Sequence, residues 1–423
     1  MATERTNAFK NPCYRSSSLI ILLFFTGWGI WWSFFQIWLT GTLHFSGAEV
    51  GTIYSFNSAA TLVVMFLYGA IQDHLGIRRT LLIVCAALQM LLGPFFTWIY
   101  APLLHGSFYA GTVIGAVYLS FAFLAASPTF EAVTERFSRR FGFEYGQARA
   151  WGSFGYALSA LAAGLLFVVS PYLVFWASSA IATVLLVVMI CDGASSRASC
   201  ARISDGRESE QNRTTPSLRE ILSVFKLRAL WQIIAYIILS WTFYTVFDQQ
   251  MFPDFYTKFF NGSTGQAMYG ALNSLEVLLE ALMMACVPWL MRRAGVRRTL
   301  LLGVVIMIVR IGGCGLVTNP VGVSLIKLLH APETALFVVG LFRYFTLHFD
   351  TKVSATLYMV GFQIAAQIGQ IIFSTPLGAV RDGIGYSSTF LLIAGIVAVA
   401  GIYALFILKR DDQDVEGQPL STK

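Results

Sequence analysis

Apolar stretches of about 20 residues recur along nearly the whole 423-residue sequence. One helix of that length crosses the hydrocarbon core of a bilayer, and in lipid only helices and closed barrels satisfy their own backbone hydrogen bonds. Charged residues make up 12% of the chain, whereas soluble domains contain about 25%. We therefore predict an all-α, polytopic membrane protein and exclude a soluble protein with one anchor.

Twelve transmembrane helices are predicted from these stretches. The connections alternate in basic residues, because one set is rich in Lys and Arg and the other contains only Lys258 and Arg381. Basic connections stay in the cytoplasm, so both termini are expected there. The net charge of +7 reflects this bias, and no basic soluble face is present that would bind nucleic acid. The predicted spans are residues 18–39, 48–72, 80–100, 107–130, 147–168, 171–191, 230–252, 266–290, 299–317, 321–343, 353–379 and 386–408.

The chain divides into two similar halves. Residues 192–218 are too polar to bury a core, and we predict a cytoplasmic linker there between six-helix bundles at 1–191 and 219–423. The segments that begin at His74 and Arg293 share the pattern Gly-x-Arg-Arg-Thr-Leu-Leu, and their positions differ by 219 residues (293 − 74). Two pseudo-symmetric six-helix bundles related by a repeat are the architecture of major facilitator transporters, which bind substrate between the bundles.

The first copy of this repeat carries a longer motif. Gly69, Asp73, Gly76, Arg78 and Arg79 form a Gly-x-x-x-Asp-x-x-Gly-x-Arg-Arg pattern that resembles the conserved loop motif of the major facilitator superfamily. We expect the Asp73 carboxylate to accept bonds from the start of the next helix and from its arginines, which would form a gating latch. The alternative is a simple charge pair at a helix end.

Ionisable residues also lie inside the predicted spans. Lys327, His330 and Glu333 follow one another at i, i+3 and i+6, so they share one broad stripe of a helix. A charge at the bilayer centre costs about 2.5–3.5 kcal/mol on insertion scales. Such residues therefore need partners, and they indicate a path for a polar substrate and for protons. Charged residues that could be their partners, in the spans or at their ends, are Glu131, Arg149, Asp248, Glu276, Glu280 and Arg310.

These charged residues carry a more specific resemblance. The segments 130–156, Phe247-Asp-Gln-Gln250 and Lys327-Leu-Leu-His330 resemble the oligosaccharide:proton symporters, the lactose permease family, over nearly the entire chain. The resemblance is strongest to the sucrose permease branch of that family. The residues that carry this second likeness are Trp31-Trp32-Ser33, Arg149-Ala-Trp-Gly-Ser-Phe-Gly-Tyr156, Phe252-Pro253 and Ser374-Thr-Pro-Leu377.

The resemblance implies a sugar site. Glu131 and Arg149 match the acid and guanidinium that bind sugar hydroxyls, for which a planar, multi-donor Arg beside a carboxylate is well suited; the alternative is a helix-end salt bridge. Tyr156 stands where lactose permease has a tryptophan that stacks on the sugar. Tyr244 and Trp28 are further candidates, although the aromatic stripe that contains Trp28 fits packing equally well.

The resemblance also implies a proton site. Glu333 matches the family's proton-binding carboxylate, and its apolar neighbours favour the neutral, protonated form. Arg310 matches the cation that releases the proton, and His330 the histidine that couples sugar to proton. Asp248 and Lys327 match a mainly structural charge pair. A second pair of the family is replaced by uncharged residues on both sides, at Thr245 and Ala366, as expected because the loss of one charge would strand the other.

Two positions depart from the family pattern. The sugar-contacting carboxylate of the eighth span does not align cleanly, since Glu276 and Glu280 flank the expected place, and we favour Glu280 slightly. Pro332 directly precedes Glu333 and cannot donate to the carbonyl of Leu328, so we expect a kink there.

We thus predict a proton-coupled symporter that imports a disaccharide by alternating access. Sucrose is favoured, with lactose, melibiose and raffinose as other candidates; the alternative is a proton-coupled exporter of amphipathic compounds on the same fold. No nucleophile–base set, metal-ligand cluster or phosphate-binding loop is found, so we expect no enzyme activity, no metal and no cofactor. The expected setting is a bacterial inner membrane, with lipid around a functional monomer.

Overall fold

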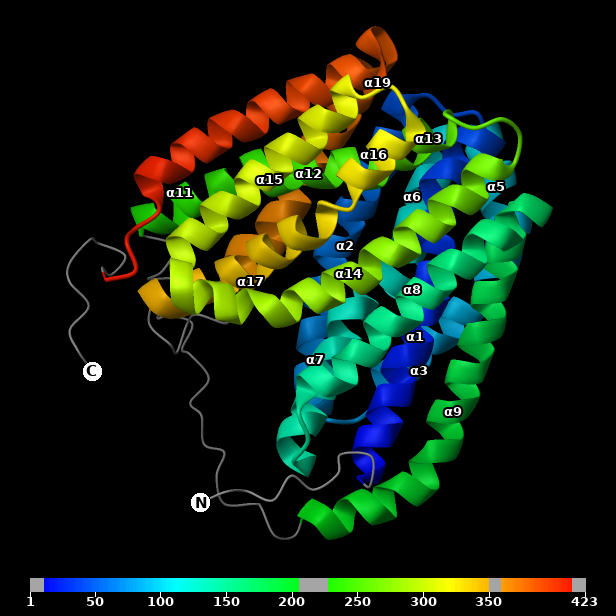
Figure 1. Ribbon diagram of the computed structural model, residues 1–423. Coiled ribbons are helices and arrows are strands. Elements are labelled where there is room, and N and C mark those ends of the chain that lie inside the picture. Colours follow the sequence, from blue (N-terminus) through cyan, green and yellow to red (C-terminus); the bar gives the residue numbers. More distant parts are fainter. Residues whose placement is uncertain (1–10, 205–226, 350–358, 413–423) are drawn as a thin grey trace. The chain divides into compact units, whose positions relative to one another are not determined.

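The computed structural model describes residues 11–204, 227–349 and 359–412 (Figure 1). These residues form helices and no strand, which confirms the all-α prediction. Short π-helical segments join several of the α-helices. The α-helices are α1 (Pro12–Ile37), α2 (Gly47–Leu75), α3 (Thr80–Met90), α4 (Leu92–Pro94), α5 (Ala101–Gly106), α6 (Phe108–Leu119), α7 (Ala126–Phe141), α8 (Tyr145–Val169), α9 (Leu173–Ser204), α11 (Arg228–Ile237), α12 (Phe243–Thr245), α13 (Phe252–Thr257), α14 (Thr264–Ala294), α15 (Val296–Leu316), α16 (Pro320–Lys327), α17 (His330–His348) and α19 (Ala365–Ile407). The π-helical segments are η2 (Trp38–Thr42), η3 (Phe95–Tyr100), η4 (Ser120–Leu124), η5 (Ile238–Thr242), η6 (Val246–Met251) and η7 (Met359–Ile364).

In the described part of the chain, ten helices are long and apolar enough to cross a membrane, and the bent pair Thr80–Met90 and Leu92–Gly106 makes an eleventh. The last of the ten, Gly361–Ile407, has 47 residues. At 1.5 Å per residue it is about 70 Å long, roughly twice the bilayer core. It is interrupted at Gly385, whose φ of 80° lies outside the helical region. This break separates the last two predicted spans.

The chain forms two compact units. Unit 1 comprises Met1–Trp38, Ala59–Asn212 and Gly262–Val277, and unit 2 comprises Leu39–Ser58, Arg213–Asn261 and Leu278–Lys423. Each unit thus includes a short segment from the other half of the chain. Helix α9 continues through the first part of the predicted linker to Ser204, and the rest of that linker lies outside the described residues.

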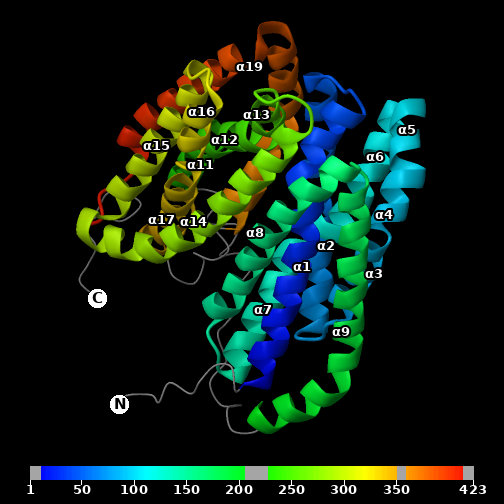
Figure 2. The same cartoon turned by 45° about the vertical axis from the view of Figure 1, so that its right-hand side comes forward.

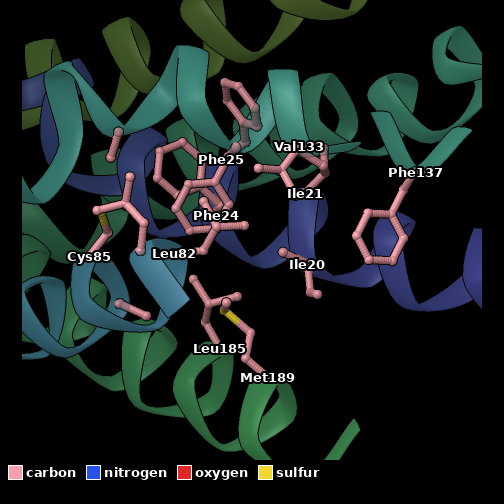
Figure 3. Close-up of a cluster of buried hydrophobic side chains, with 14 of the residues drawn as sticks. Ile20, Ile21, Phe24, Phe25, Leu82, Cys85, Val133, Phe137, Leu185 and Met189 are labelled. Carbon is pink, nitrogen blue, oxygen red and sulfur yellow. The ribbon is translucent and has the colours of Figure 1, made fainter. Parts of the chain in front are cut away.

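Unit 1 is built around α1, which packs against α8 and α9 (Figure 2). In its apolar core, Phe24 and Phe25 of α1 lie with Leu82 of α3, Val133 of α7 and Leu185 of α9 (Figure 3). Lipid is as apolar as these side chains, so close packing rather than escape from water holds the helices together.

A glycine in α8 allows this helix to approach α1 closely. A Cβ atom at Gly155 would lie 2.7 Å from the backbone oxygen of Leu22, which is closer than real Cβ contacts. Small residues at helix interfaces permit such approach within membranes. The contact sets the position of Arg149 and Tyr156 on the same helix, which matters for the site described below.

The loop motif of unit 1 forms a tight turn at Gly76, whose φ is 62°. Asp73 does not make the expected contacts, because its carboxylate pairs with Arg136 of α7 at 2.7 Å. Arg79, at the start of α3, instead reaches Asp192 near the membrane end of α9 at 2.8 Å. Arg79, which we expected to contact Asp73, thus pairs with Asp192, a residue outside the motif.

The second copy of the repeat uses an aspartate in a related way. Gly295 has a φ of 87°, and α15 begins at the next residue. The Asp411 carboxylate accepts bonds from the backbone N–H groups of Val296 (2.8 Å) and Arg297 (3.1 Å). Asp411 and Asp192 differ by 219 positions (411 − 192), which is the offset of the loop motif itself. Both halves therefore anchor this turn with an aspartate that follows their last span.

The two basic residues of the otherwise Lys- and Arg-free connections are both paired. Lys258 Nζ lies 2.7 Å from Asp254 and Arg381 Nη2 lies 2.7 Å from Asp382, all within unit 2. The Asp382 carboxylate also accepts bonds from the first two backbone N–H groups of α2, at 2.7 and 2.9 Å. A carboxylate at a helix N-terminus is stabilised by the helix dipole. Lys258 and Arg381 thus each pair with a nearby aspartate, which explains why they occur in connections that otherwise contain no Lys or Arg.

Removing the aspartate that anchors α15 should weaken unit 2. Asp411→Ala leaves the first N–H groups of α15 without a carboxylate, and we expect a loss of about 1 kcal/mol in the free energy of unfolding. A lower thermal unfolding midpoint of the purified protein in detergent would report this loss. Asp412→Ala, at the exposed neighbouring position, is the control and should leave the midpoint unchanged; equal midpoints for both variants would contradict the anchor role.

Candidate functional site

Two pairs of an arginine and a glutamate lie within the membrane spans, and they differ in exposure. Arg149 and Glu131 of unit 1 are joined at 2.5 Å, with 30% and 32% of their side chains exposed. Arg310 and Glu333 of unit 2 are also joined, and both are 0% exposed. Charged groups in membrane spans face the protein interior or a watery cavity rather than lipid. The first pair therefore marks a face that water reaches, and the second a dry interior.

The exposed pair is produced by the turn between α7 and α8. Helix α7 ends at Phe141, the next residue Gly142 has a φ of 72° that stops the helix, and α8 starts at Tyr145. This turn brings Glu131 beside Arg149. Arg149 donates from Nε to Glu131 and from Nη1 to Ser153 (3.2 Å), and its guanidinium lies 4.0 Å from the centre of the Phe25 ring. The arginine is thus fixed in orientation while part of it remains accessible.

Tyr156 and Trp28 lie near this pair in unit 1. Tyr156 is seven residues after Arg149, about two turns along α8 and therefore on the same face. Both Tyr156 and Trp28 are half-buried against the same apolar core. The aromatic stripe of α1 divides accordingly, because Trp31 and Phe35 are fully buried among other aromatic rings, whereas Trp28 keeps some exposure.

The buried pair belongs to a larger ionic cluster. Arg310 of α15 donates through Nε and Nη2 to both carboxylate oxygens of Glu333 in α17. Its Nη1 donates to Asp248 of η6 at 2.8 Å, and Lys327 donates to the same Asp248 oxygen at 2.6 Å. Two acids and two bases thus balance within the protein interior, as the cost of unpaired buried charge requires. The predicted contact between Asp248 and Lys327 is confirmed.

The expected kink before Glu333 is also confirmed. Helix α16 ends at Lys327 and α17 begins at His330, with Leu328 and Leu329 as a turn between them. Pro332 lacks the N–H that a continuous helix would need, so the chain breaks one turn earlier. The break places Lys327, His330 and Glu333 at the junction of two helices, from which all three reach the cluster.

His330 contacts groups of different character. Its Nδ1 lies 3.2 Å from the hydroxyl of Tyr244 and 3.5 Å from Asp248, and its Nε2 lies 3.7 Å from Glu280 of α14. Thr334 also lies within hydrogen-bond distance of Tyr244 and His330. His330 is therefore adjacent both to the ionic cluster and to one of the two glutamates proposed for the sugar.

The two glutamates of α14 belong to different units and differ in exposure. Glu280 lies in unit 2 beside His330, with 20% of its side chain exposed. Glu276 lies in unit 1 and is 2% exposed. Thr245 and Ala366, where the second charge pair of the family is missing, are both buried. The remaining motif residues, Gly69 and Arg78, are exposed.

Sequence reasoning missed three polar residues around these groups. Ser153 follows Arg149 at i+4, a spacing that could have revealed it. Ser33 and Asn273 contact one another at 3.0 Å although 240 positions separate them, and no local pattern indicates that contact. The sharing of Arg310 between Glu333 and Asp248 was missed as well, because it depends on three separate helical segments.

The sequence matches the profile of a family described as LacY proton/sugar symporter over residues 6–418. It is 39% identical over 408 residues to the sucrose permease of Escherichia coli, which covers 96% of both chains. It is 35% identical over 400 residues to the raffinose permease of Escherichia coli, which covers 94% of this chain and 93% of the relative.

A solved structure of the nucleoside transporter NupG shares the fold. Its TM-score is 0.77 at 15% identity, covering 94% of this chain and 99% of the other. The expectation of a major facilitator fold is thereby confirmed. The matched family and these relatives are transporters, so the expectation that the chain is not an enzyme is confirmed too.

Removing one member of the buried cluster should cost more than removing a balanced pair. Asp248→Ala removes the buried carboxylate that Lys327 and Arg310 share, and we expect about 3–5 kcal/mol of lost stability. Asp248→Ala combined with Lys327→Met removes both charges and should recover much of that loss. Thermal unfolding of both purified variants measures the difference; a double variant no more stable than the single one would contradict the pairing.

Proposed function

Since this chain belongs to the LacY proton/sugar symporter family, we propose that it imports a disaccharide together with a proton by alternating access. Sucrose is the first candidate, because the sucrose permease has the higher identity of the two relatives described above. Raffinose, melibiose and lactose, which name other relatives, come next. The contrast in exposure between the two arginine–glutamate pairs carries the proposal.

The exposed pair suits a sugar. A sugar offers neighbouring hydroxyls that can both donate and accept, and the guanidinium and carboxylate supply donors and acceptors in fixed planes. Water reaches Glu131 and Arg149, so a sugar arriving in water can replace it at these groups. Trp28 and Tyr156 provide aromatic faces nearby that can cover the apolar C–H side of a sugar ring.

The buried pair suits a proton. A proton on Glu333 would remove one negative charge from the cluster, and Arg310 would still keep Asp248 as a partner. Asp248 therefore acts as the second acceptor that allows Glu333 to become neutral without stranding Arg310. Return of Arg310 to both Glu333 oxygens would favour loss of the proton. His330, which lies between Asp248 and Glu280, is placed to sense changes on either side.

The coupling supplies energy for accumulation. A membrane potential of 100 mV contributes about 2.3 kcal/mol for each charge that crosses. Since about 1.4 kcal/mol corresponds to a tenfold ratio, one proton per sugar supports a gradient of roughly 50-fold.

The cellular location is inferred from the apolar helices, the relatives and the distribution of basic residues. The apolar helices and the bacterial relatives support a multi-pass protein of the inner membrane. We infer that both termini face the cytoplasm, because the basic connections of the sequence share the side of the termini. We propose that a single chain is the functional unit and that a proton is the coupling ion, without a cofactor.

Glu333→Gln should separate sugar movement from proton movement. The amide cannot release a proton, so cells or vesicles with this variant should lose uphill accumulation of labelled sucrose while exchange down its own gradient continues. Glu144→Gln, at an exposed position, is the matched control and should accumulate normally. Uphill accumulation by Glu333→Gln would remove this residue from the coupling step.

Arg149→Lys tests the sugar contact. A lysine keeps the charge but not the planar fork, and we expect sugar affinity to fall about 10- to 100-fold. Arg139→Lys changes the exposed arginine of the Arg139–Glu135 pair and serves as control. Binding of sucrose to purified protein measures both, and wild-type affinity in Arg149→Lys would refute the assignment.

A further inference from the structure

Three polar side chains from three helices of unit 1 form a hydrogen-bonded group. Asn273 of α14 donates from Nδ2 to the hydroxyl oxygen of Ser33 in α1 at 3.0 Å. The hydroxyl of Ser33 lies 3.4 Å from that of Tyr156 in α8. Ser33 and Asn273 are only 5% and 9% exposed, whereas Tyr156 is half-buried. The group therefore runs from the interior of unit 1 to a tyrosine that keeps some exposure.

The hydrogen bonds of Ser33 define how the group is held. Its hydroxyl lies 2.7 Å from the carbonyl oxygen of Gly29, one turn earlier in α1, and donates to it. With that proton committed, the Ser33 oxygen serves as acceptor for the Asn273 amide. Ser33 has no second proton, so in its 3.4 Å contact with Tyr156 the tyrosine O–H donates to the Ser33 oxygen.

Packing alone does not require this group. Small or apolar residues would join three helices within a membrane as well, and a hydrogen bond between membrane helices adds little stability on average. Tyr156 shares its face of α8 with Arg149 of the exposed pair and with Ser153, which accepts a hydrogen bond from Arg149. The polar groups of this face thus continue from the proposed sugar contact to the tyrosine hydroxyl.

We propose that Ser33 and Asn273 are positioning residues that fix the Tyr156 hydroxyl, and that this hydroxyl selects among disaccharides. The inference rests on the proposed sugar transport. With its proton donated to Ser33, the Tyr156 oxygen can only accept a hydrogen bond from a sugar hydroxyl, and a sugar whose stereochemistry places no hydroxyl there leaves this acceptor unpaired. Such mismatches of buried polar groups discriminate strongly between otherwise similar ligands.

The experiment compares uptake of sucrose, raffinose, melibiose and lactose by Ser33→Ala, Asn273→Leu and Tyr156→Phe. For the sugar that the wild type prefers, each variant should raise KM about 3- to 10-fold with kcat retained. KM for the other sugars should change less. The difference in KM between the preferred sugar and the others should therefore become smaller, by a similar factor, in all three variants. The variant Ser33→Ala with Tyr156→Phe should be no worse than either alone, since the two changes remove one unit. Ser33→Thr keeps the hydroxyl, so this variant should show the wild-type preference among the four sugars.

A matched control removes a hydrogen bond of α1 that does not involve Tyr156. Ser178 of α9 donates to the carbonyl oxygen of Gly27 at 2.7 Å, so Ser178→Ala should lower stability without changing the order of sugars. Proton uptake per sugar should stay constant in every variant, because Glu333 and Arg310 belong to unit 2.

The outcomes separate the two claims. Equal loss for all sugars in Ser33→Ala, or additive effects with Tyr156→Phe, would refute the positioning role while sugar transport itself stands. A wild-type protein that moves none of these sugars would refute the proposed function. A change of preference in Ser178→Ala as large as in Ser33→Ala would also overturn the inference, because general loosening of α1 would then explain both.

Discussion

Arg310 is a permanent cation without contact with water, and this constraint organises unit 2. A guanidinium in such a place needs carboxylates on more than one side, and Glu333 and Asp248 provide them from separate helical segments. The neighbouring Lys327 shares Asp248, so the charges of the four residues are mutually dependent. The break at Leu328 and Leu329, which Pro332 explains, brings Lys327 and Glu333 to this one cluster.

Arg149 is held in a different way from Arg310, and it keeps part of its side chain exposed. Glu131, Ser153 and the ring of Phe25 orient Arg149 from one side, and part of it remains open to water. An arginine in that state can change partners without a large cost, whereas Arg310 can change partners only within its cluster. Exchangeable partners fit the proposed contact of Arg149 with sugar, and a fixed set of partners fits the proposed binding and release of a proton at Glu333.

Much of this arrangement could be predicted from the sequence, and the missing parts have a common cause. Apolar stretches predicted the helices, because the length and hydrophobicity of a stretch are enough to indicate a membrane helix. Pro332 predicted the local break in the same way, from its own lack of an N–H. Asp73 was assigned to the wrong arginine, since the competing Asp192 lies 119 positions away in the sequence (192 − 73). The same holds for Ser33 and Asn273. Contacts between distant segments depend on which helices become neighbours, and a single sequence does not encode that in any local pattern.

The accessibility of the Arg149–Glu131 pair has a consequence for cells in media of changing salinity. Groups that water reaches are also reached by dissolved ions, and at 0.15 M salt the field of an exposed charge is largely screened beyond about 8 Å. If Arg149 binds the sugar as we propose, chloride and other anions would compete with the sugar there as the medium becomes saltier, while the fully buried Arg310 would stay shielded from them. Salt stress would then act on the capture of nutrient and leave the energising step intact.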